Sequence, residues 1–510
     1  MATFTRKNAW NQNGTFHNPD LLWYAKGVSV MQSRSLNDQT SWWFFAAIHG
    51  NRWPNIPGPP LVPTTPQPSQ GLIDQYWAQC QHGTWFFPPW HRGYLYAIEN
   101  ILREIIQSLG GPGDWTLPYW NYFGPDNQYK IPPAFTVQNL PDGDLNPLLV
   151  AARYGPNNDG NIFVPLSSWG ITQECQKDYD FVGGNSNGNS GDYGGAETGF
   201  EHFASLFGDL EWNPHNFVHA AVGGQTPTGR GGLMSNPETA GLDPIFYLHH
   251  CNIDRMWAAW NSSGKANPND PNWLSGPTAS GDRKFYMPKP DRTPWQYAPD
   301  VVNDTGQLNY TYDNLSLGIP PELAGRDALR LRNFGLTMDE TRLLSTMNLN
   351  ANTELVGANS SMTTLDATGA RTTVKLDSKG WETVTKSLTN TFAARINNSP
   401  AATNLPDQVY LQLEGVKGNE DSIVCSVSIN QQYVGHISLF GLYNASIKDS
   451  QHGGAGLTIR LDITKIVDQM HLSGMAELNS LDVLIQPVNI VAEGSELTID
   501  RVSVYRKGLM

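Results

Sequence analysis

The chain has 510 residues, of which 39% are hydrophobic and 11% aromatic, enough apolar material for a buried core in more than one domain. A net charge of -14 argues against nucleic acid or an anionic membrane as a partner, because both select for basic patches. The four cysteines are widely separated, so their spacing does not predict a disulfide framework.

The N-terminal residues lack the apolar core and the small-residue cleavage site of a signal peptide. The longest apolar runs, such as Trp42 to Ile48, are much shorter than the ~20 residues that a membrane helix needs. We therefore expect a cytoplasmic protein without a membrane partner; export on a partner protein would leave no trace in these residues.

The first histidines of interest lie in or near aromatic segments. A segment with helical periodicity ends at His49, and the stretch from Cys80 to Arg92 places His82 and His91 among aromatic residues and prolines. The run from Gly93 to Ser108 that follows is typical of an amphipathic helix. Neutral imidazole is a good ligand for copper, zinc, iron or nickel, and stiff neighbours favour a site formed before the metal arrives.

A second group of histidines follows beyond residue 200. His215 and His219 are spaced i and i+4, which places them on one face of a helix. Further along, Phe246, His250 and Asp254 repeat at helical spacing. The two groups together supply enough imidazoles for more than one metal ion.

The C-terminal part of the chain has a different period. Beyond about residue 380, apolar and polar residues alternate, as in Val409 to Leu413 and Leu481 to Ile485, and Gly and Asn turns separate these segments. We predict a mainly α-helical bundle with long loops at residues 1–315, a polar connector at 316–380 and an all-β antiparallel sandwich at 381–510. The Gly/Asn/Ser-rich run from Gly183 to Gly195 is expected to be a surface loop.

The histidine pattern favours a catalytic metal centre. Three neutral ligands on each of two metals leave open positions, as catalysis requires. The softness of imidazole and the affinity order of divalent metals favour copper, and a pair of copper ions can activate dioxygen. The six candidate ligands are His49, His82, His91, His215, His219 and His250.

Two longer patterns resemble the copper signatures of the tyrosinase and polyphenol oxidase family. The first is His82-x4-Phe87-Pro88-x-Trp90-His91-Arg92-x2-Leu95-x3-Glu99. The second is Asp243-Pro244-x-Phe246-Tyr247-x2-His250-x3-Asp254, preceded by His215-x3-His219. The resemblance implies a helical bundle that holds two copper ions, ortho-hydroxylation of small monophenols, and oxidation of o-diphenols to o-quinones with O2 as co-substrate. It also implies that His250, rather than His249, is the ligand.

Further residues resemble parts of the same family. Arg6 with Tyr310-Thr311-Tyr312 is similar to the arginine–tyrosine pairing that closes the catalytic domain. The spacing of Cys80 and His82 resembles that of a thioether between the cysteine and the histidine ring in fungal and molluscan relatives. Residues 381–510 resemble the C-terminal β domain that shields the copper site of plant-type enzymes and keeps them latent.

Glu211 and Asn216 resemble the pair that orders a basic water in members active on monophenols, although a carboxylate there is also common as a charge at a helix start. The resemblance gives four more residues a place at the pocket: a small Ala220 at the entrance, Asn236 or Pro237 over the copper, and Phe246 beneath the ligands. Asp254 is expected to form salt bridges of the bundle or to orient ligands.

Three other functions fit parts of the sequence. A haemocyanin-like O2 carrier shares both signatures, but the chain has one copy of the copper domain and no internal repeat, which favours an enzyme. A diphenol-only catechol oxidase or an o-aminophenol oxidase would use the same scaffold, because access and proton transfer separate these activities. A zinc hydrolase is the most distant alternative, since no carboxylate ligand of the usual kind is found.

Overall fold

The computed structural model divides the chain into two compact units, one made of Met1–Val182 and Asp192–Gly318, and the other beginning at Ile319. The structure describes residues 4–53, 58, 60–182, 192–200, 202, 207–277, 284–319, 330, 353–396, 406–449, 453–473, 478–492, 494–495 and 497–508. Most of the predicted loop from Gly183 to Gly195, and about half of the predicted connector, lie outside these residues.

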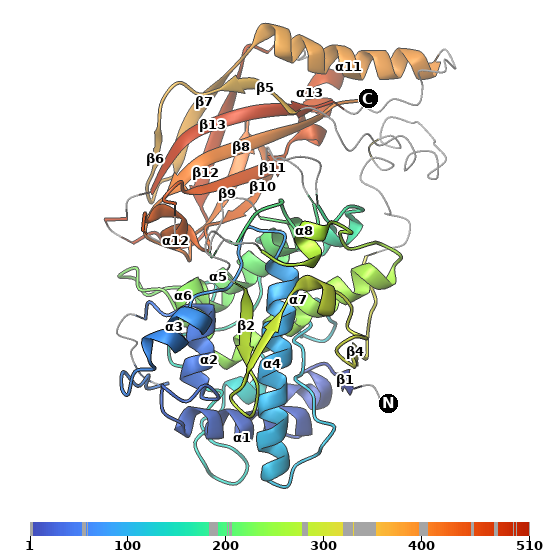
Figure 1. Ribbon diagram of the computed structural model, residues 1–510. Helices are drawn as coiled ribbons and strands as arrows, with labels where there is room; N and C mark the ends of the chain where they lie inside the picture. The colour runs from blue at the N-terminus through green and yellow to red at the C-terminus, as the bar shows by residue number, and fades with distance from the viewer. Residues whose placement is uncertain are drawn as a thin grey trace. The chain divides into compact units, whose positions relative to one another are not determined.

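The first unit is mainly helical (Figure 1). Its α-helices are α1 (Pro19–Ser33), α2 (Trp42–His49), α3 (Gln70–Tyr76), α4 (Phe87–Ser108), α5 (Phe217–Gly223), α6 (Pro237–Ala240), α7 (Pro244–Ser262) and α8 (Pro271–Leu274). A short π-helical segment, η4 (Glu211–Asn216), precedes α5. The long helix α4 packs against both α1 and α7, so it forms the centre of the bundle.

The starts of α2 and α7 follow from their sequences. Ser41 caps α2 by accepting a hydrogen bond from the Phe44 amide at 3.0 Å. Asp243 caps α7 in the same way through the Ile245 amide, also at 3.0 Å, and Pro244 occupies the first helical position, where it costs no hydrogen bond. Both helices are almost entirely buried, because each carries apolar residues on every face.

Strands occur in the first unit only as short pairs. β1 (Phe4–Arg6) pairs in parallel with β4 (Tyr310–Tyr312), which places Arg6 beside Tyr312. β2 (Phe285–Pro288) and β3 (Pro294–Tyr297) form an antiparallel hairpin. The β1–β4 pair joins the two ends of the first unit.

The second unit contains a nine-stranded sheet with antiparallel pairing, which confirms the predicted class. The strands are β5 (Thr353–Ala358), β6 (Thr363–Leu365), β7 (Ala370–Leu376), β8 (Gln408–Lys417), β9 (Val424–Ile429), β10 (Gln432–Ser438), β11 (Leu457–Asp462), β12 (Ser480–Pro487) and β13 (Leu497–Lys507). Their order is β10-β9-β12-β7-β5-β13-β8-β11, and β6 pairs with β13. The edge strands approach each other, since a Cβ at Gly435 of β10 would lie 3.7 Å from Leu461 of β11. The strands thus curl as one sheet around their core.

The second unit differs from the prediction in two details. Its sheet includes β5, β6 and β7, which lie inside the stretch expected to be a connector at 316–380. These strands are rich in Thr and charged residues, so their composition suggested a loop, yet Val356, Leu365 and Val374 are buried in the core. The unit also contains the helices α11 (Ser378–Ile396), α12 (Leu442–Ser446) and α13 (Thr464–Leu472), so it is not all β.

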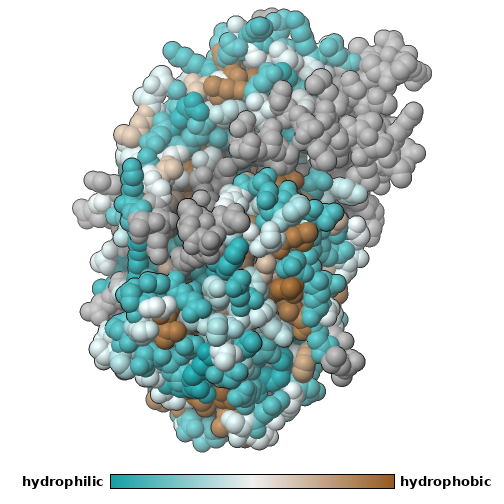
Figure 2. All heavy atoms as spheres, viewed as in Figure 1, coloured by the Kyte–Doolittle hydropathy of each residue, from teal (hydrophilic) through white to brown (hydrophobic). Residues whose placement is uncertain are grey.

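The visible surface is mainly hydrophilic, with scattered apolar patches (Figure 2). Many of the large aromatic residues are inside, and Trp42, Trp90, Trp120 and Trp257 are fully buried. Among the described residues, no helix has the length and apolar character that a membrane crossing would require.

Candidate metal centre

His49 is the last residue of α2 and is completely buried. Its Nδ1 lies 2.7 Å from the carbonyl oxygen of Pro237, which can only accept, so Nδ1 carries the proton. The lone pair is therefore on Nε2, which is buried and has no hydrogen-bond partner within the described parts of the chain. A buried nitrogen in this state is costly unless a cation binds it.

His91 repeats this arrangement on α4, and His82 lies on the loop before it. The Nδ1 atom of His91 donates to the Phe87 carbonyl at 2.8 Å, and its buried Nε2 has no hydrogen-bond partner among the residues that the structure describes. The ring of His82 lies 5.2 Å from that of His49 and 5.4 Å from that of His91, centre to centre. Three imidazoles thus converge on one point.

The second group comes from η4, α5 and α7. The Nδ1 atom of His215 donates to Asn216 Oδ1 at 2.8 Å, and that of His219 donates to the Met234 carbonyl at 2.7 Å. Their Nε2 atoms each lie 3.3 Å from Nε2 of His250. Since His215 and His219 have their proton on Nδ1, their Nε2 atoms carry lone pairs at the point where the three rings meet, and a metal cation at this point would be bound by them.

Burial keeps all of these imidazoles neutral. It lowers the pKa of His49 and of His215 to about 3. It lowers the pKa values of His82, His91, His219 and His250 well below their usual range, and the neighbouring histidines add to this effect. Neutral imidazoles with defined tautomers are the form that binds copper or zinc, so the residues present fit a metal pair.

The two groups lie against each other. The rings of His91 and His250 are stacked, with centres 4.4 Å apart and planes 16° apart. Phe246 packs against members of both groups, with ring centres 4.8 Å from His49, 4.1 Å from His250 and 5.8 Å from His219. The arrangement suits a dinuclear centre on an apolar base.

His249 is a histidine of this region that the sequence resemblance set aside. It is fully buried, its ring stacks on that of His215 at 5.3 Å, and it lies 5.0 Å from the ring of His219. With His215, His219 and His250 it forms a group whose ligand atoms all lie within 4.8 Å of one another. The geometry therefore brings four histidines, rather than three, to the second group.

Glu211 and Asn216 both lie at the histidines, at opposite ends of η4. Both carboxylate oxygens of Glu211 accept from the backbone amide of Gly83, at 3.0 and 2.9 Å, and Gly83 follows His82 directly. Burial raises the pKa of Glu211 well above its usual range, while the Gly83 amide lowers it. Gly83 has φ +65°, a conformation that a glycine adopts without strain. Glu211 thereby ties η4 to the loop of the first group.

Cys80 contacts two histidines, one of which no sequence pattern identifies. Its Sγ lies 3.3 Å from Nδ1 of His82 and 3.2 Å from Nδ1 of His202. His202 is buried, and its Nε2 lies 3.7 Å from a carboxylate oxygen of Glu238. Neither His202 nor Glu238 belongs to a recognisable spacing pattern, so only the fold could bring them together with Cys80.

The remaining candidate residues flank the histidines. Asn236 caps α6 by accepting from the Glu238 amide at 2.8 Å, and Pro237 holds His49 through its carbonyl. Glu238 in turn accepts from the amides of residues 51 and 52, just after His49. Ala220 is buried beside His219.

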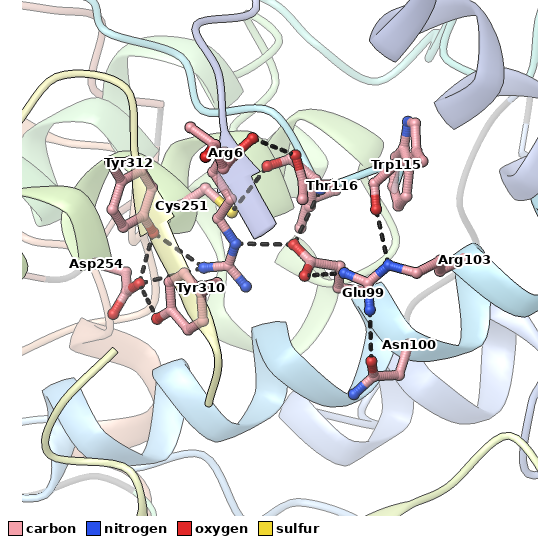
Figure 3. Close-up of polar contacts among 12 residues, drawn as sticks. Arg6, Glu99, Asn100, Arg103, Trp115, Thr116, Cys251, Asp254, Tyr310 and Tyr312 are labelled. Carbon is pink, nitrogen blue, oxygen red and sulfur yellow. Dashed lines mark hydrogen bonds and ion pairs between the residues drawn. The ribbon is translucent and has the colours of Figure 1, made fainter. Parts of the chain in front are cut away.

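Asp254 lies one helical turn after His250, in a buried ion network (Figure 3). Its carboxylate accepts from Arg92 at 2.5 Å, from Arg6 at 3.2 Å, and from the hydroxyls of Tyr310 and Tyr312 at 2.5 Å each. The Arg6 guanidinium stacks on the Tyr310 ring at 3.9 Å, which confirms the predicted arginine–tyrosine pairing. The network fixes the helices that carry His91 and His250.

Comparisons with known proteins agree with this geometry. Residues 39–263 match the family model of the common central domain of tyrosinase, and residues 352–507 match a domain of unknown function. A tyrosinase of Hahella sp. (strain CCB-MM4) is 31% identical over 98% of this chain and 99% of its own length. A latent-form chloroplastic polyphenol oxidase of Prunus armeniaca is 29% identical over 46% of this chain and 38% of its own length.

Two solved structures share the fold. The structure of a latent apple tyrosinase aligns with a TM-score of 0.53 and 17% identity over 99% of this chain and 97% of the other. A latent aurone synthase, described as a polyphenol oxidase, aligns with a TM-score of 0.55 and 17% identity over 100% of this chain and 90% of the other.

Proposed function

The chain belongs to the tyrosinase family and is a copper oxidoreductase of phenols, and we propose that it both hydroxylates small monophenols at the ortho position and oxidises o-diphenols to o-quinones with O2. The observation that carries the proposal is the placement of Glu211 and Asn216. Glu211 accepts a hydrogen bond from the Gly83 amide, directly after His82, and Asn216 accepts one from His215. Hydroxylation of a monophenol begins with removal of its proton, and oxidation of a catechol has less need of a fixed base.

In the proposed site, His49, His82 and His91 hold one copper ion, and His215, His219 and His250 hold the other. When bound, the copper pair supplies the electron transfer between phenol and dioxygen. The protein fixes the tautomers of four of these histidines. The carbonyls of Pro237, Phe87 and Met234 accept from His49, His91 and His219, and the side chain of Asn216 accepts from His215. Phe246 and the buried aromatic residues around it exclude water from the base of the site.

The proposed base for the monophenol proton is a water molecule held by Glu211 and Asn216. Glu211 is buried and anionic only at a cost, which makes its carboxylate a strong acceptor for a water proton. Asn216 accepts from His215, so its side-chain amide is held in one orientation. The two residues together would receive the phenolic proton next to the second copper ion.

Replacing Asn216 with alanine is expected to lower kcat/KM for a monophenol such as tyrosol by at least about tenfold, and to lower that for the matching catechol much less. Oxygen uptake by the copper-loaded protein with each of the two substrates gives the ratio of monophenol to catechol activity. Asn213→Ala is the matched control, because the Asn213 side chain bonds to Gly170 and to the Thr172 amide instead of a histidine. An equal loss of both activities in Asn216→Ala contradicts the role, and absence of monophenol turnover in the unmodified protein makes it a catechol oxidase.

We also propose a thioether between Cys80 and His82, supported by their 3.3 Å contact and by the complete burial of both residues. Its formation removes the thiol hydrogen and one ring hydrogen, with dioxygen as the electron acceptor. The denatured, copper-free protein should therefore be lighter by the mass of two hydrogens than its sequence requires. Cys80→Ser should abolish this difference and Cys251→Ser, at another buried cysteine, should retain it. If the protein without substitutions has the full mass calculated from its sequence, the cross-link is ruled out.

A further inference from the structure

A polar cavity of about 530 Å³ lies in the first unit, beside the C-terminal part of α7. Its walls consist of residues from the 258–274 segment and from residues 303–305, and none of the described lining residues is a histidine. Amide and hydroxyl groups dominate the lining, and its charged members are two cations, Arg92 and Lys265, and one carboxylate, Asp304. Lys265 donates to the Gln176 carbonyl, which leaves two of its three ammonium hydrogens for other acceptors. The volume falls within the ~300–1,000 Å³ that is typical of sites for small molecules.

Arg92 brings to this cavity a buried guanidinium that is incompletely paired. Its side chain has 0% exposure, its Nε donates to Asp254 and its Nη1 donates to the Val302 carbonyl at 3.1 Å. The guanidinium lies 3.6 Å from the centre of the Trp257 ring. Its Nη2 is buried and has no hydrogen-bond partner in the described parts of the chain. A charged donor left in this way favours an acceptor from outside the protein.

The ion network to which Arg92 belongs also carries more positive than negative charge, and Figure 3 shows its members Arg6, Glu99, Arg103 and Asp254. Glu99 is shared by Arg6 and Arg103, and Asp254 is shared by Arg6 and Arg92. Three guanidinium groups therefore face two carboxylates, which leaves one positive charge in excess. Arg92 is the member of this network that lines the cavity, and with Lys265 it gives the lining two positive charges against the one negative charge of Asp304.

We propose that the cavity is a binding site for a small organic anion. Its carboxylate or phosphate group pairs with Arg92 and Lys265, because a planar guanidinium and an ammonium together match an oxyanion in shape and charge. Its polar body contacts the amides of Asn261 and Asn303 and the hydroxyl of Thr305, which also line the cavity. Since Arg92 follows His91 on α4, the bound anion also reinforces the helix that carries one of the histidines.

Calorimetric titration of the copper-loaded full chain with glycerol phosphate and with succinate, at constant ionic strength, tests the proposal. Saturable binding of at least one probe is expected, and the preferred probe tells whether the cavity takes a phosphate or a carboxylate. Lys265→Met should weaken binding by about tenfold, the loss expected for one charge-assisted hydrogen bond. Lys289→Met is the matched control, because it removes an exposed cation next to the β2–β3 turn and outside the cavity.

Asn269→Asp provides a second variant that leaves Lys265 in place. Asn269 is exposed and lines the cavity, so the substitution adds a negative charge at the rim and should also weaken binding. Absence of saturable binding with both probes overturns the proposal. Equal weakening in Lys265→Met and Lys289→Met overturns it too, because this would show attraction to net charge without a site.

Discussion

Replacing His250 with alanine is expected to reduce the copper content from two ions per chain to one and to lower phenol oxidation by on the order of a thousandfold. Nε2 of His250 lies 3.3 Å from Nε2 of both His215 and His219, so it is the shared member of the second group. Without it, two ligands remain on helical segments that are fixed by other contacts. Loss of a metal that contributes several kcal/mol to the transition state accounts for the size of the effect.

The neighbouring residue supplies a matched control. His249→Ala removes the same imidazole from an equally buried position of α7, and it is expected to retain two copper ions and to lower activity far less. Metal analysis of both variants shows whether His250 or His249 is the copper ligand. One copper ion in His249→Ala together with two in His250→Ala would exchange their roles, and one copper ion in both would make the second site a four-histidine site.

Lowering the pH of the copper-free protein from about 7.5 to about 5.5 is expected to reduce the free energy of unfolding of the first unit by about 1.4 kcal/mol for each buried histidine of the centre. Burial holds the pKa of His49 and His215 at about 3 in the folded state, compared with 6.5 for a histidine of the unfolded chain. Between these values the unfolded chain binds more protons than the folded one. The stabilisation is therefore complete above pH ~6.5 and is lost as the pH falls toward ~3.

Urea unfolding, followed by tryptophan fluorescence at several pH values, measures the slope of the free energy of unfolding against pH. Glu238 changes the slope only at lower pH, because hydrogen bonds from His202 and the backbone lower its pKa to about 2 despite burial. Glu211, whose pKa burial raises well above its usual range, opposes the histidines, since the folded state holds its proton more tightly than the unfolded chain. His49→Gln should reduce the slope, because one fewer group takes up a proton on unfolding. Phe246→Leu, a neighbour without a proton to exchange, should lower stability at every pH and leave the slope as it was. Equal slopes in the unmodified protein and in His49→Gln would show that the pH dependence arises from other groups.

The sequence predicts much of the first unit because the relevant signals are local. The i, i+4 spacing of His215 and His219 places both rings on one side of a helical segment, and the structure has them 4.5 Å apart. The caps at Ser41 and Asp243 are likewise properties of a few adjacent residues. The period of two expected beyond about residue 380 correctly predicted the antiparallel strands from β8 onward, although the first residues of that stretch form α11.

Other features depend on residues that are far apart in the chain, and only the tertiary structure decides them. The Pro237 carbonyl that sets the tautomer of His49, and the Gly83 amide that binds Glu211, are backbone groups that no side-chain pattern reveals. His249 and His202 reach the centre because the surrounding helices and loops are close-packed. Strands β5 to β7 are stable through pairing with β12 and β13, despite a polar composition. Residue identity thus determines which groups are able to bind a metal, and burial with backbone pairing determines which of them meet.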